Sequence, residues 1–244
     1  MENNEHWEDF GAGIRLLVSP EHTFGTDSFL LASFAGVRRK DKACDLGTGC
    51  GIIPFLWARS DSAPQSAFAV DIQPQAIGQL SQSVTQSGLE GRVLPLLADL
   101  REGLPEIEAG SLDIITCNPP YKAVDTGFQN QGENQRLARH EVTCTIEDVC
   151  KAAARLLRFG GRLCLCQRPE RLVDALEAMR RWKLEPKRLQ LVQKRGDTAP
   201  WLFLVEGKRG AKPFLQIEAP FVCWEGDSPS RQLQELFPFY TAKI

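Results

Sequence analysis

Short apolar segments alternate with amphipathic helical patterns through the middle of this 244-residue chain, and this alternation limits the possible folds more than any other feature. The predicted strands in this part of the chain are 42–46, 66–71, 92–98, 112–117 and 162–167. The predicted helices between and after them are 52–60, 74–87, 145–159 and 169–182. Because each parallel strand pair needs a crossover connection, this order predicts a parallel sheet with helices on both faces.

Two further apolar segments, 188–193 and 201–207, are separated by a short polar link. A link of this length is too short for a helical crossover and predicts an antiparallel hairpin. The expected fold is therefore α/β and Rossmann-like, with a seven-stranded, mostly parallel sheet, a terminal antiparallel hairpin and helices on both faces. Residues 1–40 are expected to form an N-terminal cap segment and residues 41–244 the main domain.

The helix predicted from residue 145 has the clearest local signals for its two ends. Thr145 suits the N-cap, and Asp148 is placed to complete a capping box with it. Gly160 and Gly161 follow the apolar pattern and are expected to end the helix, because glycine readily adopts the left-handed conformation of a helix C-terminus.

Composition and charge restrict the environment and the ligands of the chain. The net charge of −2 argues against a general binder of polyanions, so any nucleic-acid surface must be local. The acidic, polar N-terminus does not resemble a secretory signal, and no apolar segment approaches membrane-spanning length. We therefore expect a cytoplasmic protein without membrane association. The eight cysteines form no C-x-x-C pair and the three histidines are scattered, which indicates reduced, buried thiols and no metal site.

A glycine-rich loop follows the first strand of the predicted parallel sheet. Gly47, Gly49 and Gly51 permit a tight turn and a close approach of a ligand to the backbone. The spacing is G-x-G-x-G and the next residue is Ile52, whereas the dinucleotide fingerprint G-x-G-x-x-G requires glycine or alanine at that position. Asp45 adds a carboxylate that would repel a pyrophosphate and would favour a cationic ligand. S-adenosylmethionine, with a sulfonium, an ammonium and no phosphate, is such a ligand.

Two more carboxylates follow later strands of the same predicted sheet. Asp71 ends the second strand, where it can accept hydrogen bonds from both ribose hydroxyls, a feature shared with NAD-binding proteins. Asp99 follows the third strand, where it can accept from an adenine amino group. Either residue alone is compatible with an ordinary strand end. Together with Asp45 they lie in register at the edge where open α/β sheets bind ligands.

These segments resemble a known family. The stretches CDLGTGCG, AVDIQP, LLADL and DIITCNPPY are similar to motifs I to IV of class I S-adenosylmethionine-dependent methyltransferases, and the NPPY tetrad is similar to that of the amino-methyltransferases. FGTDSFLLASFA and ENQRLARHEVTCTIEDV resemble the bacterial family of tRNA(Val) adenine-37 N6-methyltransferases. The resemblance covers nearly the whole chain. The cofactor-binding residues that the motifs and this resemblance indicate are Thr26, Asp27, Asp45, Gly47, Gly49, Gly51, Asp71, Ile72, Asp99, Leu100 and Asn118.

The tetrad Asn118, Pro119, Pro120 and Tyr121 is the predicted catalytic group. An exocyclic amine on a conjugated ring is a poor nucleophile, because its lone pair is delocalised into the ring. The side-chain oxygen of Asn118 and the carbonyl of Pro119 can accept the two amine hydrogens and direct the lone pair. The prolines hold these acceptors rigidly, which is preorganisation. Tyr121 is expected to stack on the base.

Basic stretches at 37–40, 180–197 and 207–212 are either a track for RNA phosphates or ordinary solvated surface. The resemblance implies a tRNA substrate, S-adenosylmethionine as the methyl donor and S-adenosylhomocysteine as the product. No obligate protein partner is evident. Other targets of similar tetrads are an rRNA or DNA base and the N5 of a protein glutamine. An NAD(P)-dependent oxidoreductase and a non-catalytic RNA-binding module are the alternatives from other classes.

Overall fold

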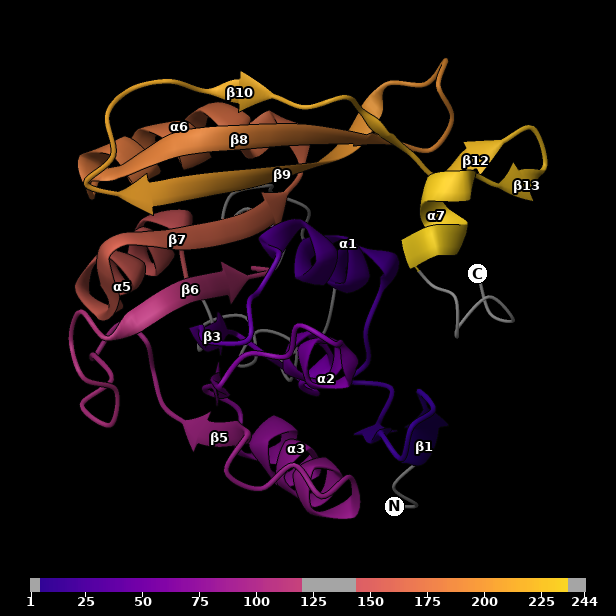
Figure 1. Cartoon of the computed structure of the whole chain (residues 1–244), viewed down its shortest axis with the longest axis vertical. Coiled ribbons are helices and arrows are strands. Elements are labelled where there is room, and N and C mark those ends of the chain that lie inside the picture. The colour runs from indigo at the N-terminus through magenta and orange to yellow at the C-terminus, as the bar shows by residue number, and fades with distance from the viewer. Residues whose placement is uncertain (1–4, 120–143, 237–244) are drawn as a thin grey trace, which may run out of the picture.

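One central sheet organises the computed structural model, which describes residues 5–119 and 144–236 (Figure 1). From one edge to the other, its strands are β10 (Gln216–Ile217), β8 (Leu184–Gln193), β9 (Pro200–Arg209), β7 (Leu157–Gln167), β6 (Leu112–Cys117), β3 (Lys42–Leu46), β4 (Ser66–Asp71) and β5 (Val93–Leu97). A further strand, β11 (Phe221–Val222), also pairs with β8. The pairs among β5, β4, β3, β6 and β7 are parallel, whereas β9 is antiparallel to both of its neighbours.

The predicted Rossmann-like sheet with its terminal hairpin is therefore confirmed, and β8 and β9 form the hairpin. Within the described residues the sheet contains nine strands, where seven were expected. The two additional strands, β10 and β11, contain two residues each and pair with β8 at the edge of the sheet. Segments this short carry no alternating pattern that a sequence could reveal.

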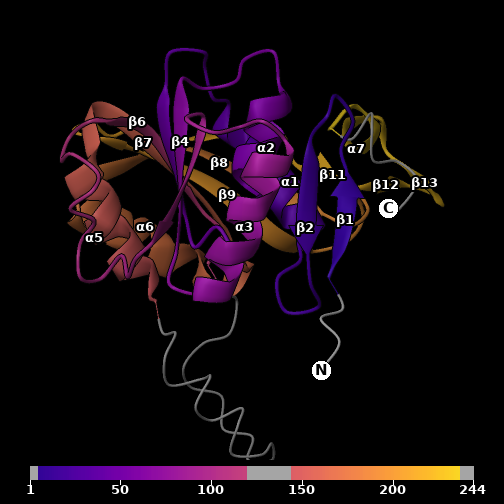
Figure 2. The same cartoon turned by 90° about the horizontal axis from the view of Figure 1, so that it is seen from below.

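Helices cover both faces of the sheet (Figure 2). One face carries α1 (Thr26–Ala35), α2 (Ile52–Arg59) and α3 (Pro74–Gln86), and the other carries α5 (Ile146–Leu156) and α6 (Leu172–Arg181). The short elements are the hairpins β1 (His6–Asp9) with β2 (Arg15–Val18) and β12 (Trp224–Glu225) with β13 (Ser228–Pro229), the 3-10 helix η1 (Pro169–Arg171) and α7 (Arg231–Leu236).

Alternate residues of the strands fill two separate cores, as the period of two in a strand requires. In β7, Cys164 and Cys166 belong to the core shared with α1 and α2, whereas Leu163 and Leu165 belong to the core shared with α5. All eight cysteines are free thiols, and all but Cys144 are buried. This confirms the expectation that the thiols are reduced and that most of them are packed in the interior.

The expected end of α5 is wrong, although its start is confirmed. The Thr145 hydroxyl accepts a hydrogen bond from the Asp148 amide at 3.1 Å, and the Asp148 carboxylate accepts one from the Thr145 amide at 3.0 Å. The helix ends at Leu156, so that Gly160 and Gly161 lie within β7. A Cβ on Gly161 would lie 3.0 Å from the carbonyl oxygen of Leu112. The glycine thus permits the close approach of β7 to β6.

The segment expected to form a cap contributes to the main core. Phe29, Leu30 and Leu31 of α1 are buried in the same cluster as Ile53 and Phe55 of α2. The β1–β2 hairpin packs against α3, where the Ser83 hydroxyl accepts a hydrogen bond from the Leu17 amide at 2.9 Å. The division at residue 40 stays a prediction. Among the described residues, no helix is long and apolar enough to span a membrane, and no three metal-ligating side chains cluster.

Candidate active site

The carboxyl ends of β3, β4, β5 and β6 surround a cavity of about 520 Å³. Eight of the predicted site residues line it, and they come from four separate segments of the chain. These residues are Gly47, Gly49, Asp71, Ile72, Asp99, Leu100, Asn118 and Pro119. The fold therefore brings most of the predicted cofactor-binding and catalytic residues to one place, at the edge where open α/β sheets bind ligands.

The glycine loop presents open backbone to this cavity. Gly47 and Gly49 have φ angles of +69° and +55°, and a Cβ on either residue would meet no atom within 4 Å. The amides of Gly47 and Thr48 both donate to the carbonyl of Val70, which fixes the loop against the end of β4. The loop is thus held in a left-handed conformation that favours glycine, and a ligand can approach its backbone closely.

Gly51 has a different role, because it does not line the cavity. Its φ angle is +87°, and a Cβ there would lie 2.3 Å from Cδ1 of Leu80. The residue also precedes the first turn of α2. Gly51 is therefore required for the packing of α2 against α3, whereas the contribution to the ligand cavity comes from Gly47 and Gly49.

Asp71 holds the loop and also faces the cavity. Its carboxylate accepts hydrogen bonds from the Gly49 amide at 2.8 Å and from the Gln73 amide at 2.9 Å. The residue is 5% exposed. Since each carboxylate oxygen can accept more than one hydrogen bond, Asp71 retains capacity for the hydroxyls of a ligand.

Asp45 lies beneath the loop and does not line the cavity. Its carboxylate is 2% exposed and accepts a hydrogen bond of 2.6 Å from the Thr116 hydroxyl. Burial raises the pKa of Asp45 to about 7, although the hydrogen bond from Thr116 lowers it and the nearby Asp71 charge adds to the increase. Asp45 therefore places an ionisable carboxyl next to the ligand cavity, separated from solvent.

Asp99 is paired with a side chain that the sequence did not single out. Its carboxylate accepts hydrogen bonds from the Arg101 guanidinium at 2.6 to 3.0 Å, and these bonds lower the pKa of Asp99. Both residues line the cavity. The predicted contact of Asp99 with an adenine amino group stays a prediction, and it requires the carboxylate to accept from a ligand in addition to Arg101.

Asn118 is held by two neighbours whose contacts with it the sequence did not reveal. Its Nδ2 donates to the Ser28 hydroxyl of α1 at 3.4 Å, and its Oδ1 accepts from the Cys166 thiol of β7 at 3.1 Å. These contacts fix the amide at the wall of the cavity from two elements. Only Ser28 had a sequence signal, because it lies in the FGTDSFLLASFA stretch.

The remaining predicted residues lie apart from the cavity or outside the described structure. Thr26 lines a different cavity, and Asp27 accepts a hydrogen bond from the Ser28 amide at the start of α1. Pro120 and Tyr121 lie outside the described residues. The cavity also contains residues that the sequence analysis missed, namely Glu21, His22, Thr23, Val70, Gln73, Ala98, Arg101, Cys117 and Cys144.

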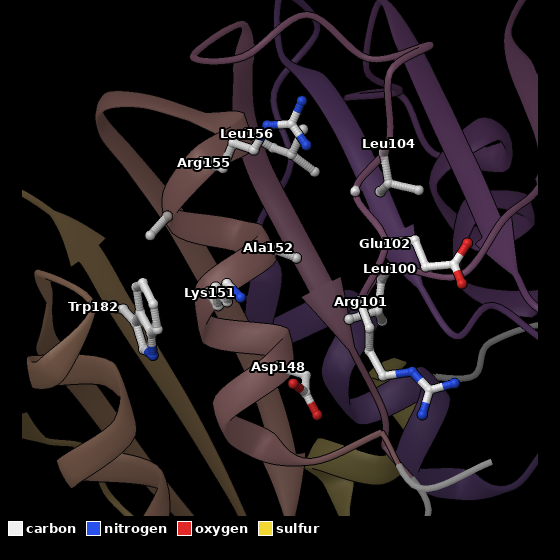
Figure 3. Close-up of a pocket in the computed structure, with 12 residues that line it drawn as sticks. Leu100, Arg101, Glu102, Leu104, Asp148, Lys151, Ala152, Arg155, Leu156 and Trp182 are labelled. Carbon is white, nitrogen blue, oxygen red and sulfur yellow. The ribbon is translucent and has the colours of Figure 1, made fainter. Parts of the chain in front are cut away.

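A second cavity, of about 420 Å³, shares Leu100 and Arg101 with the first (Figure 3). Figure 3 shows the loop that carries these residues facing Asp148, Lys151 and Arg155 of α5. Neither the glycine loop nor Asn118 lines this cavity. It is therefore not the candidate active site.

The predicted phosphate track is divided between opposite edges of the sheet. Residues 37–40 precede β3, residues 180–188 precede or begin β8, and residues 207–212 end or follow β9, so all three lie at the amino edge of the parallel strands. Of the basic stretch, only Lys194 and Arg195 follow β8 at the edge that carries Asn118. Arg195 is ion-paired with Asp227 at 3.3 Å.

The charges around the first cavity fit a cationic, hydroxyl-bearing ligand. Among the described residues that line it, three are acids, Glu21, Asp71 and Asp99, and the single Lys or Arg is Arg101, which is paired with Asp99. With an open glycine backbone beside a buried carboxylate, the site matches S-adenosylmethionine better than a pyrophosphate cofactor.

The strand order and this site together define a class I methyltransferase. A family model described as "Methyltransferase small domain" matches residues 21–181, and the chain belongs to this family. A tRNA1(Val) (adenine(37)-N6)-methyltransferase of Parabacteroides distasonis is 29% identical over 75% of each chain. One of Tolumonas auensis is 29% identical over 77% of each chain.

Solved structures share the fold at lower sequence identity. A predicted O-methyltransferase of Agrobacterium tumefaciens has a TM-score of 0.68 and 18% identity, covering 87% of this chain and 96% of its own. The M. jannaschii tRNA m1G37 methyltransferase has a TM-score of 0.59 and 17% identity, covering 87% of this chain and 59% of its own. At these identities the likeness supports the fold alone.

Proposed function

We propose that the chain transfers a methyl group from S-adenosylmethionine to N6 of an adenine in tRNA, namely adenine 37 of tRNA(Val), and releases S-adenosylhomocysteine. The names of its relatives and the sequence of the NPPY tetrad support this target. The observation that carries the chemistry is the Asn118 amide, which is fixed by Ser28 and Cys166 at the wall of the cavity formed by the glycine loop. A tRNA substrate would place the reaction in the cytoplasm.

Different residues of the cavity would bind different parts of the methyl donor, S-adenosylmethionine. The open backbone at Gly47 and Gly49 would hold its amino acid part, and the acid at the end of β4, Asp71, would accept its ribose hydroxyls. Asp99 and Leu100 would surround its adenine. S-adenosylmethionine, when bound, supplies a methyl group on a sulfonium, which needs no further activation.

The tetrad would prepare the nucleophile. Oδ1 of Asn118 accepts a hydrogen bond from the Cys166 thiol, and since a carbonyl oxygen can accept more than one hydrogen bond, it would also accept one from the target amine. The Pro119 carbonyl would accept the other hydrogen. Two fixed acceptors orient the amine lone pair toward the methyl group, so positioning supplies most of the catalysis. The proton is lost after transfer, when the methylated amine is acidic, and no strong general base is required.

Replacing Asn118 tests this assignment. In Asn118→Ala the rate of methyl transfer should fall by about 100-fold or more, the scale on which a preorganised hydrogen-bonding group acts. The affinity for S-adenosylhomocysteine, measured by isothermal titration calorimetry, should stay close to that of the wild type. Gln65→Ala is the matched control, because Gln65 is an exposed amide before β4 at the opposite edge. A wild-type rate of tritiated methyl transfer in Asn118→Ala would refute the role.

A further inference from the structure

A third cavity, of about 380 Å³, opens beside the active site and has no part in the function described so far. Two indoles, Trp201 and Trp224, line it together with Lys194, Thr198 and Thr26. Both tryptophans are half-buried, whereas Lys194 is exposed. Flat apolar rings next to a cation are the combination with which proteins bind single-stranded nucleic acid.

Two routes along the chain connect this cavity to Asn118. Ser28, which accepts from the Asn118 amide, lies two positions after Thr26 at the start of α1. Cys166, which donates to Asn118, lies two positions before Arg168. The Arg168 guanidinium lies over the Trp201 ring at 5.4 Å from its centroid. Two residues of helix or strand span only about 3 to 7 Å, so the cavity adjoins the catalytic amide.

The order of the strands places this cavity on the correct edge of the sheet. β6, β7, β9 and β8 are consecutive neighbours, and β8 has the same direction as β6 and β7. Lys194 directly follows β8, and Trp201 lies at the start of the antiparallel β9. Both residues therefore lie at the same sheet edge as Asn118.

The Trp201 ring is anchored in place. Arg168 donates from Nη1 to the Trp201 carbonyl at 3.1 Å, in addition to its contact with the ring. The Trp201 side chain also forms a hydrogen bond with the Cys223 thiol, on the segment that precedes Trp224. The Trp224 amide in turn donates to the Lys194 carbonyl at 2.9 Å. A ring positioned in this way loses little conformational entropy when a base stacks on it.

The charge beside the indoles is available to a phosphate. Within residues 5–119 and 144–236, Lys194 has no ion-pair partner. By contrast, Arg180 of α6, which precedes β8, pairs with Glu185, and Arg188 in the first half of β8 pairs with Glu206.

We propose that the cavity lined by Trp201, Trp224 and Lys194 binds a nucleotide that neighbours the target adenine in the tRNA loop. Its base stacks on the indoles and its phosphate pairs with Lys194. This proposal rests on the proposed function and adds the element that holds the loop open beside Asn118, since specific RNA recognition uses splayed, stacked bases. A protein partner or a second copy of the chain would use the same indoles without any RNA dependence.

Binding of a labelled tRNA(Val) anticodon stem-loop, measured by fluorescence anisotropy with S-adenosylhomocysteine present, tests the cavity. Trp201→Ala and Trp224→Ala should each raise the Kd about 5- to 150-fold, which corresponds to stacking losses of ~1–3 kcal/mol. Trp201→Phe should retain most of the affinity, because it keeps a stacking face. Trp7→Ala is the matched control, since Trp7 is 40% exposed and lies in the β1–β2 hairpin.

The role of Lys194 is tested by the salt dependence of RNA binding. Lys194→Ala should reduce the slope of log affinity against log salt by about 0.7, the share of one phosphate contact on single-stranded nucleic acid. Lys208→Ala, an exposed lysine at the opposite edge, should leave the slope unchanged. Unaltered S-adenosylhomocysteine affinity shows that each variant is folded. If Trp201→Ala does not fold, Trp224→Ala and Lys194→Ala decide the question.

The outcomes separate the two proposals. If the wild type binds and methylates the stem-loop while the tryptophan and lysine variants bind it equally well, the cavity has another occupant and the inference is overturned. If the wild type binds no RNA and methylates none, the proposed function fails and the inference fails with it.

Discussion

At the scale of single residues, the active site depends on contacts between side chains that are far apart in the sequence. Asp45 and Thr116 are 71 positions apart, and Ser28 and Asn118 are 90 positions apart. These pairs place a buried carboxyl and a fixed amide beside one cavity. The Asp45 carboxyl affects the stability of the fold, because an ionised group without solvent is costly.

The raised pKa of Asp45, about 7, predicts how the stability of the unliganded protein depends on pH. Between roughly pH 4 and 7 Asp45 is protonated in the native state and ionised in the unfolded state, so its contribution to the free energy of unfolding falls as pH rises. The decline should be about 1.4 kcal/mol per pH unit inside this window and should stop above it. Asp45→Asn should lack this decline. Urea denaturation of both proteins across the window measures the difference.

The control for this experiment is Asp61→Asn, which changes an exposed carboxylate. Its stability should follow the wild type at each pH. Parallel curves for the wild type and Asp45→Asn would contradict the assignment of a raised pKa to the buried carboxyl.

Strand ends and glycine patterns in the sequence identified residues that the fold brings together at one cavity. Gly47, Gly49, Asp71 and Asn118 line this cavity, and their roles in binding and catalysis stay predictions. The sequence could not show that Asp99 pairs with Arg101 or that Cys166 contacts Asn118. Such contacts depend on side-chain direction and on neighbours across the sheet, and no local pattern encodes either of them.

At the scale of elements, the loop between β3 and α2 combines two requirements in one short segment. Gly49 faces open space in the ligand cavity, whereas Gly51 faces Leu80 of α3. Both have positive φ angles, so any side chain adds backbone strain. Gly49 thus serves the ligand cavity, whereas Gly51, two positions later in the same loop, serves the packing of the helices.

The two glycines should respond differently to alanine. Gly51→Ala should lower the free energy of unfolding by more than the ~1–2 kcal/mol of left-handed strain, because its Cβ would also clash with Leu80 at 2.3 Å. Gly49→Ala should cost only the strain but should weaken S-adenosylhomocysteine binding. Urea denaturation measures the stability of each variant, and isothermal titration calorimetry measures its affinity for S-adenosylhomocysteine. Equal loss of stability in both variants would contradict the separation.

Most elements were predictable because their periodicity is strong, and the errors have local causes. The α5 start was recognised from its capping box, but its end was misplaced, because the glycine pair serves the β6–β7 contact and not a helix terminus. β10 and β11 were missed because two-residue strands have no periodic pattern.

At the scale of the whole molecule, the two edges of the sheet at which its parallel strands begin and end carry different functional groups. The carboxyl edge carries the donor cavity, Asn118 and the two tryptophans, whereas most of the predicted phosphate track lies at the amino edge. Charge runs in the sequence could not reveal this division, because strand direction decides to which edge a loop belongs. The proposed nucleotide site therefore depends on the topology of the hairpin formed by β8 and β9, which places Lys194 and Trp201 at the carboxyl edge.

The most direct test is methylation of a tRNA(Val) transcript with labelled S-adenosylmethionine, followed by nucleoside mass spectrometry and mapping of the modified position. The account predicts a single product, N6-methyladenosine at position 37, which is formed by the wild type and lost in Asn118→Ala. Methylation of a different nucleoside, or an unchanged amount of the same product in Asn118→Ala, would contradict it.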